Sequence, residues 1–489
     1  MAQTLPIPAG PPLEATRKAA GYVAALAGAQ AVAVQAAASA TLAALVWPLI
    51  PAARAVAGLA GALYQQPPLP GQQILVTPGP GGAGRAATVP GRRAAAGPIT
   101  LGVEEEFVLL DPATGATVLA AGELVRMLGG EPGVRTELMR FQVETATGVC
   151  TSLEEAGRDL ARLRRLAADA AAQLGCRLVA CGVAPYRTPG LAALTGQPRY
   201  RELARRYAPV VAQAGTCACH VHVAVPSRDL GAQVLARLRP WLAPLLAITA
   251  NSPIAFGHET GWASWRHALW SRWPTATPPE PWPDAAAYDT AVRRLIARGA
   301  AIDEPNVYFL ARLSPRYPTV EVRVADVCLD AGTAVLAAGL TRALVATALA
   351  EARRGTPAPA PPARRVAAAL AAAARHGLAG PGIDPVTGQP AGARVLRARL
   401  LEHVRPALSD HGDTETITGL LDRLDDQGTG ADRQRALFTR GLSTPAFITA
   451  LARATLSGCE PGRQRPGYPG PGSGRRAAVS RRHDEQPEA

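Results

Sequence analysis

Four short segments of the chain alternate between polar and apolar residues, a pattern typical of β-strands with one polar face. They read GVEEEF (102–107), FQVET (141–145), CHVHV (219–223) and TVEVRV (319–324). CRLVACGV (176–183) is predicted to be a further strand.

Other segments carry apolar residues at helical spacing, and we expect helices over 151–175, 232–253, 331–355 and 363–380. The first has Thr151 and Ser152 as capping candidates and Gly175 just after its end, while prolines interrupt the second. Strands and helices do not alternate strictly, as they would in βαβ units. The pattern therefore predicts an α+β fold with a mostly antiparallel sheet.

Each of the four patterned strands carries two polar residues at positions i and i+2, which lie on one face of a strand. The pairs are Glu104 with Glu106, Gln142 with Glu144, His220 with His222, and Glu321 with Arg323. Any single pair is compatible with a solvated strand face, but four pairs of ligand-type residues favour a shared polar cavity. Several carboxylates in such a cavity favour Mg²⁺ or Mn²⁺, and an arginine among them suits phosphoryl transfer.

The segment GTCACHVHVAV (215–225) also raises the question of a zinc site. On an extended strand, Cys217 and Cys219 face away from His220 and His222, so one tetrahedral ion cannot take all four. We therefore favour a strand on which the two cysteines pack in the core and the two histidines carry the function, over a zinc site.

Composition divides the chain into an Ala-rich helical extension (1–65), a Pro/Gly-rich linker (66–98), a catalytic domain (99–458) and a disordered tail (459–489). Residues 19–53 carry no charge, but they are rich in alanine and Pro48 interrupts their most apolar part. We therefore favour a surface or accessory helix over membrane association of this extension.

The net charge of +13 could indicate a nucleic-acid partner, but the distribution of the charge along the chain does not support this interpretation. Residues 1–98 hold much of the excess, and no basic stripe is interleaved with aromatic residues. The cysteines are sparse and number seven, which is not a disulfide framework and indicates a cytoplasmic protein.

Seven motifs occur in order over residues 99–456 and resemble the carboxylate-amine ligases of the glutamate–cysteine ligase type 2 family. They are TLGVEEEFVLLDPATG, QVETATGVC, CHVHVAVPSRD, RPWLAPLLAITANSP, ETGWASWRHALWSRWPTA, YPTVEVRVADVCLD and GTGADRQRA. The resemblance implies a glutamine-synthetase-like fold, in which a curved antiparallel sheet forms a funnel with helices outside. It also implies that ATP phosphorylates a carboxylate, normally the γ-carboxylate of glutamate, and that an amine, normally that of cysteine, attacks the acyl phosphate.

The resemblance assigns roles residue by residue. The expected metal ligands are Glu104, Glu106, Glu137, Glu144, His220 and Glu321. The expected nucleotide contacts are Gln142, His220 and His222, with His222 nearer the substrate. Arg323 is expected to face phosphate, and Arg266 and Arg272 are candidates for binding the carboxylate of the amino acid. For these last two, a packed aromatic–arginine cluster is an equal alternative.

The segment DEPNVYFLARLSPRYPT (303–319) departs from the family pattern DEGxIYWDxRPSxRYPT, with Leu310 where aspartate is usual. Pro305, Phe309 and Leu313 are also off the pattern, as are Arg140 and Phe141 elsewhere. Three functions therefore remain open: a glutamate–cysteine ligase, a ligase with another carboxylate and amine, and a catalytically impaired homologue that binds nucleotide or amino acid. The expected partners are small-molecule amino acids and amines, and the sequence is compatible with a homo-oligomer.

Overall fold

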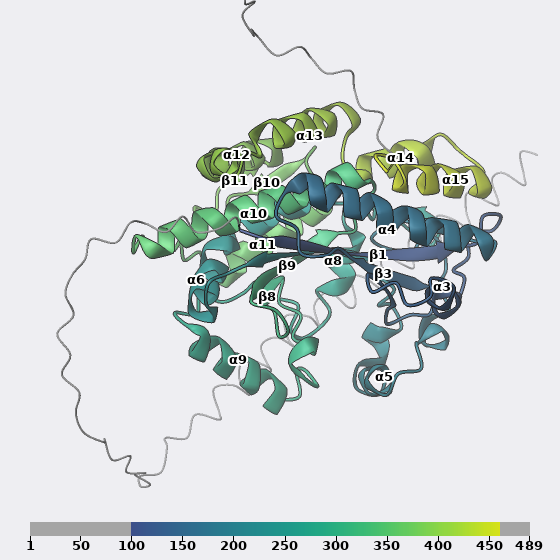
Figure 1. Ribbon diagram of the computed structural model, residues 1–489, viewed down its shortest axis with the longest axis horizontal. Coiled ribbons are helices and arrows are strands. Elements are labelled where there is room, and N and C mark those ends of the chain that lie inside the picture. The colour runs from purple at the N-terminus through teal and green to yellow at the C-terminus, as the bar shows by residue number, and fades with distance from the viewer. Residues whose placement is uncertain (1–98, 460–489) are drawn as a thin grey trace, which may run out of the picture. The chain divides into compact units, whose positions relative to one another are not determined.

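The computed structural model describes residues 99–459 (Figure 1). The expected N-terminal extension and the linker lie outside the described residues. So does the expected tail, apart from Cys459, which is buried. The expectation about membrane association of the extension therefore also falls on residues outside the described part.

The centre of the described domain is an antiparallel sheet with the strand order β2-β3-β1-β5-β9-β8, and β4 also pairs with β1. The four patterned segments form the adjacent strands β3, β1, β5 and β9, which confirms the α+β prediction. The strands are β1 Leu101–Leu110, β2 Val134–Thr136, β3 Gln142–Ala146, β4 Arg177–Val179, β5 Ala218–Ala224, β8 Ala311–Leu313 and β9 Thr319–Asp326. Two small hairpins pair β6 Ile254–Ala255 with β7 His258–Glu259, and β10 Pro381–Ile383 with β11 Pro390–Gly392.

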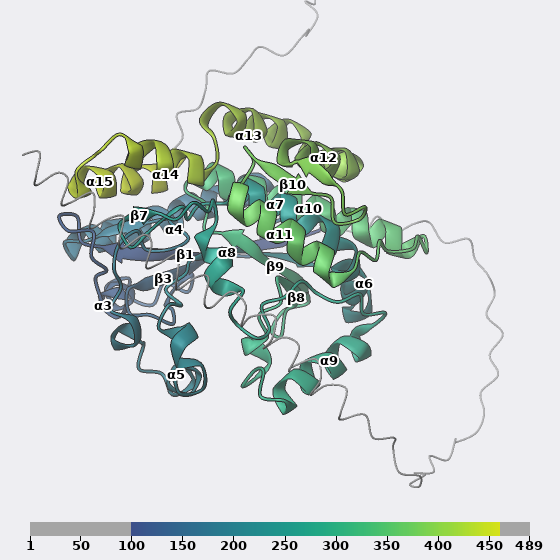
Figure 2. The same cartoon turned by 180° about the vertical axis from the view of Figure 1, so that it is seen from behind.

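Helices cover the sheet in layers. In Figure 1, α4 and α10 lie above the sheet, α12 to α15 lie above them, and α5 and α9 lie below it; the view from behind agrees (Figure 2). The helices are α3 Ala121–Met127, α4 Leu153–Gln173, α5 Pro198–Val211, α6 Arg228–Leu238, α7 Leu242–Thr249, α8 Trp265–Trp270, α9 Ala285–Ala297, α10 Ala331–Arg353, α11 Ala363–His376, α12 Ala393–Asp410, α13 Thr414–Gln427, α14 Gly430–Thr439 and α15 Thr444–Thr455. Short 3₁₀ turns are η1 Gly190–Ala193, η2 Arg239–Trp241 and η3 Glu304–Asn306.

The helix boundaries follow from local chemistry. Ser152 caps α4 by accepting a hydrogen bond from the backbone N–H of Glu155, as the sequence predicts. After the helix, Gly175 adopts φ +73°, a conformation that glycine tolerates best. The predicted helix over 232–253 is divided into α6, η2 and α7 around Pro240.

Helix α10 is long and apolar enough to cross a membrane, yet 78% of its most apolar window is buried inside the protein. It packs against the sheet and against α4, α6, α7, α12 and α13. An apolar surface all around a helix is expected where neighbours surround it. Among residues 99–459, α10 is the only helix that meets these length and hydropathy criteria, and it is a core element of this domain.

Glu105 points to the helix-covered face of β1, opposite to Glu104 and Glu106, as strand alternation predicts. Its carboxylate is fully buried and accepts two hydrogen bonds from Arg164 of α4, at 2.8 and 2.5 Å. Arg164 also donates to the backbone carbonyls of Thr455 and Cys328. This ion pair therefore connects the sheet with α4 and the end of α15.

Candidate active site

A cavity of ≈ 380 Å³ opens on the face of the sheet opposite α4. Its walls come from β1, β3, β5 and β9, from α5 and α8, and from the segments around β2 and β8. The polar pairs of the four patterned strands all reach it, so the predicted convergence occurs. The charged, histidine and amide residues that line it are Glu104, Glu106, Arg135, Glu137, Gln142, Glu144, Gln197, Arg199, His220, His222, Arg312, Arg316, Glu321 and Arg323.

Three of these residues form a compact group of potential metal ligands. Ligand atoms of Glu104, His222 and Glu321 all lie within 4.8 Å of one another. The register explains the grouping, because His222 is the direct partner of Glu321 on β9. On its other side, His222 is the partner of Gly102, two residues from Glu104. The resemblance names His220 as the metal histidine, whereas the compact group contains His222; the metal role of His220 stays a prediction.

His220 lies directly opposite Glu104 on β1, and its Nδ1 is 3.3 Å from a Glu104 carboxylate oxygen. Burial, together with the charge of Arg323, lowers the pKa of His220 to about 3, so its ring is neutral at neutral pH. The Nε2 atoms of His220 and His222 are both buried and have no hydrogen-bond partner among residues 99–459. Unpaired buried ring nitrogens beside carboxylates are a donor set that suits a divalent cation.

A second acidic group consists of Glu106, Glu137 and Glu144. Burial and the charges of Glu137 and Glu144 raise the pKa of Glu106 well above its usual range. Burial likewise raises the pKa of Glu144 to about 7, although Arg135 opposes this shift. The protein thus supplies too little positive charge for these carboxylates, and a bound cation would favour their ionised forms.

Arg135 on β2 donates to Glu104 and to Glu144, and so joins the two acidic groups. Tyr200 of α5 donates a hydrogen bond to Glu137 at 2.8 Å. Neither residue was among the sequence candidates. The register between β2 and β3 places Arg135 opposite Glu144, and this pairing identifies Arg135 only once the structure is known.

Glu321 is held between two arginines. Arg312 donates to it at 2.8 and 3.1 Å, and Arg323 donates to the same carboxylate. Burial opposes ionisation of Glu321, but the charges of Arg323 and Arg312 outweigh it and lower the pKa. Arg323 reaches the cavity as expected, whereas sequence reasoning missed Arg312, the direct β8 partner of Glu321.

Gln142 lines the cavity, but the protein already satisfies its amide. The amide N–H group donates to the Thr216 carbonyl at 2.8 Å, and the amide oxygen accepts from the Met139 N–H at 3.2 Å. The bond to Thr216 ties β3 to the segment that enters β5, and the bond from Met139 is local. Gln142 therefore shapes the cavity wall and has little capacity left for the nucleotide contact expected from the resemblance.

Arg266 and Arg272, the candidates for binding a substrate carboxylate, do not line the cavity. Arg266 is 1% exposed, lies 3.8 Å from the Asp326 carboxylate and packs over the Trp270 ring at 5.4 Å. Arg272 is exposed and donates to the side-chain oxygen of Gln213. Of the two alternatives, the packed aromatic–arginine cluster describes Arg266.

Cys217 and Cys219 are fully buried in the two main apolar clusters and are absent from the candidate metal group. The cavity therefore presents histidines and carboxylates, while the two cysteines pack.

Three of the off-pattern residues in 303–319 belong to the apolar core and do not line the cavity. Leu310 and Leu313 are 2% and 1% exposed, and Phe309 packs against Trp282 with ring centroids 5.2 Å apart. Pro305 does line the cavity, and its carbonyl accepts from Arg312 at 3.1 Å. Elsewhere, Arg140 is exposed and Phe141 is buried.

Known proteins match this architecture. Two solved ligase structures, each 14% identical, share the fold: the glutamate–cysteine ligase of Francisella tularensis in complex with AMP has a TM-score of 0.56, covering 74% of this chain and 89% of that one. A bifunctional glutathione synthetase from Pasteurella multocida has a TM-score of 0.52, covering 74% and 52%.

Sequence relatives cover most of their own length. A Nocardia farcinica protein named "Putative glutamate–cysteine ligase 2-1" is 44% identical over 364 residues, 74% of this chain and 94% of that protein. A Saccharopolyspora erythraea protein of the same name is 45% identical over 343 residues, covering 70% and 91%. The model of glutamate-cysteine ligase family 2 matches residues 100–454. The chain therefore belongs to the glutamate-cysteine ligase family 2.

Proposed function

We propose that this protein is an ATP-dependent carboxylate-amine ligase that joins the γ-carboxylate of glutamate to the amine of cysteine. The observation that carries the proposal is the convergence of Glu104, His222 and Glu321 within 4.8 Å, in a cavity that also holds Arg312 and Arg323. Carboxylates and a histidine suit divalent cations, and arginines suit phosphate oxygens. The names of the relatives supply the substrate pair.

The residues of the cavity fit Mg²⁺ or Mn²⁺. Glu104, His222 and Glu321 would hold one ion, and Glu106, Glu137 and Glu144 would hold another. The unpaired Nε2 of His222 and the uncompensated charge of the second group support this fit. When bound, the ions would neutralise charge on the phosphates of ATP.

The chain's own residues contribute positioning and charge. Arg323 would orient the phosphoryl group that is transferred to the carboxylate, and Glu321 and the backbone hold Arg323 in place. Trp270, Trp273 and Tyr308 line the same cavity and would limit water around the acyl phosphate. The amine then attacks the acyl carbon, the amide bond forms and phosphate leaves.

A different carboxylate and amine pair is the second candidate, because the off-pattern Pro305 lines the cavity and can alter its shape.

All seven cysteines are free and buried, which suits a protein that works in the reducing cytoplasm.

The test is a ligation assay with the purified full chain, ATP and Mg²⁺, screened against amino acids and amines. Phosphate release and a product mass that both require glutamate and cysteine would support the proposal. Release with another pair would favour the second candidate, and ATP binding without release would indicate a catalytically impaired homologue.

The variant Glu321→Gln sharpens the metal assignment. We expect it to lower the rate by about 1,000-fold, since it removes both a ligand and the partner of two arginines. The variant Glu415→Gln is the matched control, because it makes the same change at an exposed residue that lies outside the cavity. Full activity in Glu321→Gln would reject the metal assignment.

A further inference from the structure

Five arginines line the cavity, and four of them form ion pairs with carboxylates of the protein. Arg135 pairs with Glu104 and Glu144, Arg199 with Asp303, and Arg312 and Arg323 with Glu321. The fifth, Arg316, makes no ion pair and no side-chain hydrogen bond with any residue of 99–459. The four paired arginines already spend part of their charge and some of their donors on these carboxylates, whereas Arg316 has its charge and all of its side-chain donors available.

The loop that carries Arg316 connects β8 to β9 and is ordered by its own hydrogen bonds. The Ser314 hydroxyl accepts from the backbone N–H groups of Arg316 and Tyr317, at 3.4 and 3.3 Å. The backbone N–H of Ser314 donates to the Thr319 carbonyl at 3.0 Å. Pro315 and Pro318 further restrict the backbone on either side. Binding a ligand would therefore require ordering of the Arg316 side chain, while the loop is already preorganised.

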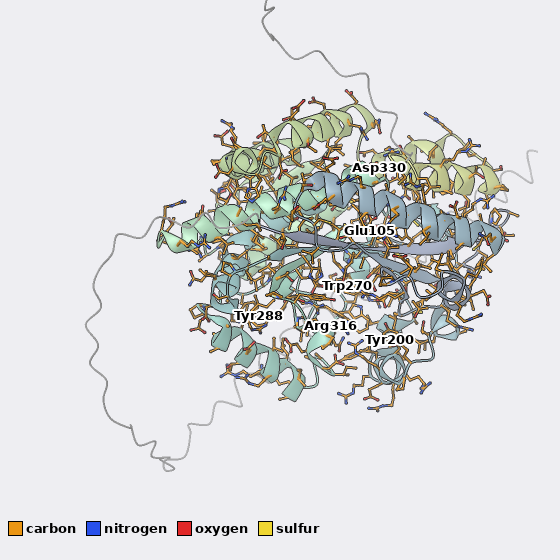
Figure 3. The ribbon with its side chains drawn as sticks, viewed as in Figure 1. Glu105, Tyr200, Trp270, Tyr288, Arg316 and Asp330 are labelled. Carbon is orange, nitrogen blue, oxygen red and sulfur yellow. The ribbon has the colours of Figure 1, made fainter. Side chains whose placement is uncertain are left out.

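This loop borders the candidate metal group. The Tyr317 ring makes an edge contact with the His222 ring, with centroids 6.0 Å apart. Ser314, Pro315, Arg316 and Tyr317 all line the cavity, and Arg316 and Tyr317 are exposed at its opening. Figure 3 places Arg316 on the same side of the sheet as Trp270 and Tyr200, which also line the cavity.

We propose that Arg316 is a binding residue for an oxyanion of a substrate, either a phosphate of the nucleotide or a carboxylate of the amino acid. A guanidinium presents its donors as a rigid fork that matches both kinds of oxyanion. The inference rests on the proposed function for the identity of these substrates, but its test measures binding and does not require turnover.

The test compares the wild-type full chain with Arg316→Gln, Arg316→Lys and Arg298→Gln. Calorimetry measures the dissociation constants of a non-hydrolysable ATP analogue with Mg²⁺ and, separately, of L-glutamate. We expect Arg316→Gln to weaken one of the two ligands by about 10-fold to 100-fold, the range of a lost charged hydrogen bond. Arg316→Lys should recover part of this loss, because an ammonium keeps the charge without the fork. Arg298→Gln is the matched control, because Arg298 is exposed and lies outside the cavity. Its dissociation constants should stay within about twofold of wild type, since the hydrogen bonds at the cavity are unchanged.

Loss of affinity for the ATP analogue alone assigns Arg316 to a phosphate, and loss for glutamate alone assigns it to the carboxylate. Unchanged constants for both ligands in Arg316→Gln overturn the proposal. An equal loss in Arg298→Gln also overturns it, because the effect would then be one of overall charge. A chain that fails to ligate glutamate to cysteine but loses nucleotide affinity in Arg316→Gln would reject the proposed function and support the role of Arg316.

Discussion

Glu104 and Glu105 are consecutive residues of β1, but they lie in opposite electrostatic environments. Glu105 is fully buried under α4, where Arg164 donates two hydrogen bonds to it. Glu104 faces the cavity, where Arg135 and two histidines surround it beside further carboxylates. The protein therefore supplies a full ion pair for Glu105. Beside Glu104, whose own pKa is, despite its burial, lowered by the two histidines, it leaves Glu106 and Glu144 with raised pKa values and too little positive charge. The difference separates a carboxylate that supports the fold from one that is prepared for a ligand.

Replacing the two residues one at a time is the sharpest test of this comparison. Glu104→Gln should lower ligase activity by about 1,000-fold, because it removes a proposed metal ligand. Its melting temperature should stay near that of wild type, since Arg135 keeps Glu144 as a partner. Initial rates and thermal melts measure both properties. Wild-type activity in Glu104→Gln would show that the two faces of β1 do not differ in function.

Arg164→Met addresses the opposite face. It leaves the Glu105 carboxylate buried and unpaired, which we expect to cost about 3–5 kcal/mol of stability. Urea unfolding of the purified variant measures this loss. If stability falls by less than about 1 kcal/mol, the buried pair contributes no more to the free energy of unfolding than an exposed ion pair would.

Mg²⁺ should bind at the cavity face of β1 and not at the helix-covered face. Its effect on stability should therefore differ between variants of the two faces. At a concentration of 100 times the dissociation constant, Mg²⁺ should stabilise the wild type by about 2.7 kcal/mol for each ion bound. The gain should be smaller in Glu104→Gln, which retains the second proposed ion group, and it should persist in full in a variant of the buried pair that still folds. Differential scanning calorimetry with added Mg²⁺, and with EDTA as the reference, reports it. Equal gains in both variants would place the ion elsewhere.

The double variant Glu105→Leu with Arg164→Leu should have the smallest effect. Removing both charges avoids an unpaired buried ion, so we expect stability within about 2 kcal/mol of wild type. Ligase activity should be retained, because neither residue lines the cavity. Loss of activity in a stable, folded double variant would show that the helix-covered face contributes to the reaction.

Local sequence patterns predicted the strands and the direction of their polar side chains well. The alternation in GVEEEF correctly places Glu104 and Glu106 on one face and Glu105 on the other. The same logic separates the histidines of β5 from Cys217 and Cys219. These predictions hold because the two-residue period of a strand is a property of the backbone itself.

The residues that the sequence missed or misplaced depend on contacts between distant segments. Arg135 and Arg312 reach the cavity because β2 and β8 pair with β3 and β9 in a register that one sequence does not reveal. Arg266 carries the charge expected of a ligand-binding residue, but it packs beside Asp326 behind the cavity wall.

The amino-acid sequence by itself thus determined which strands carry two faces, which residue types meet in one cavity, and the family to which the chain belongs. Only the tertiary structure decided that His222 joins Glu104 and Glu321, and that Arg316 keeps its guanidinium unpaired among residues 99–459. The physical reason is that side-chain alternation is local, whereas strand register and ion pairing depend on which distant segments the folded chain brings together.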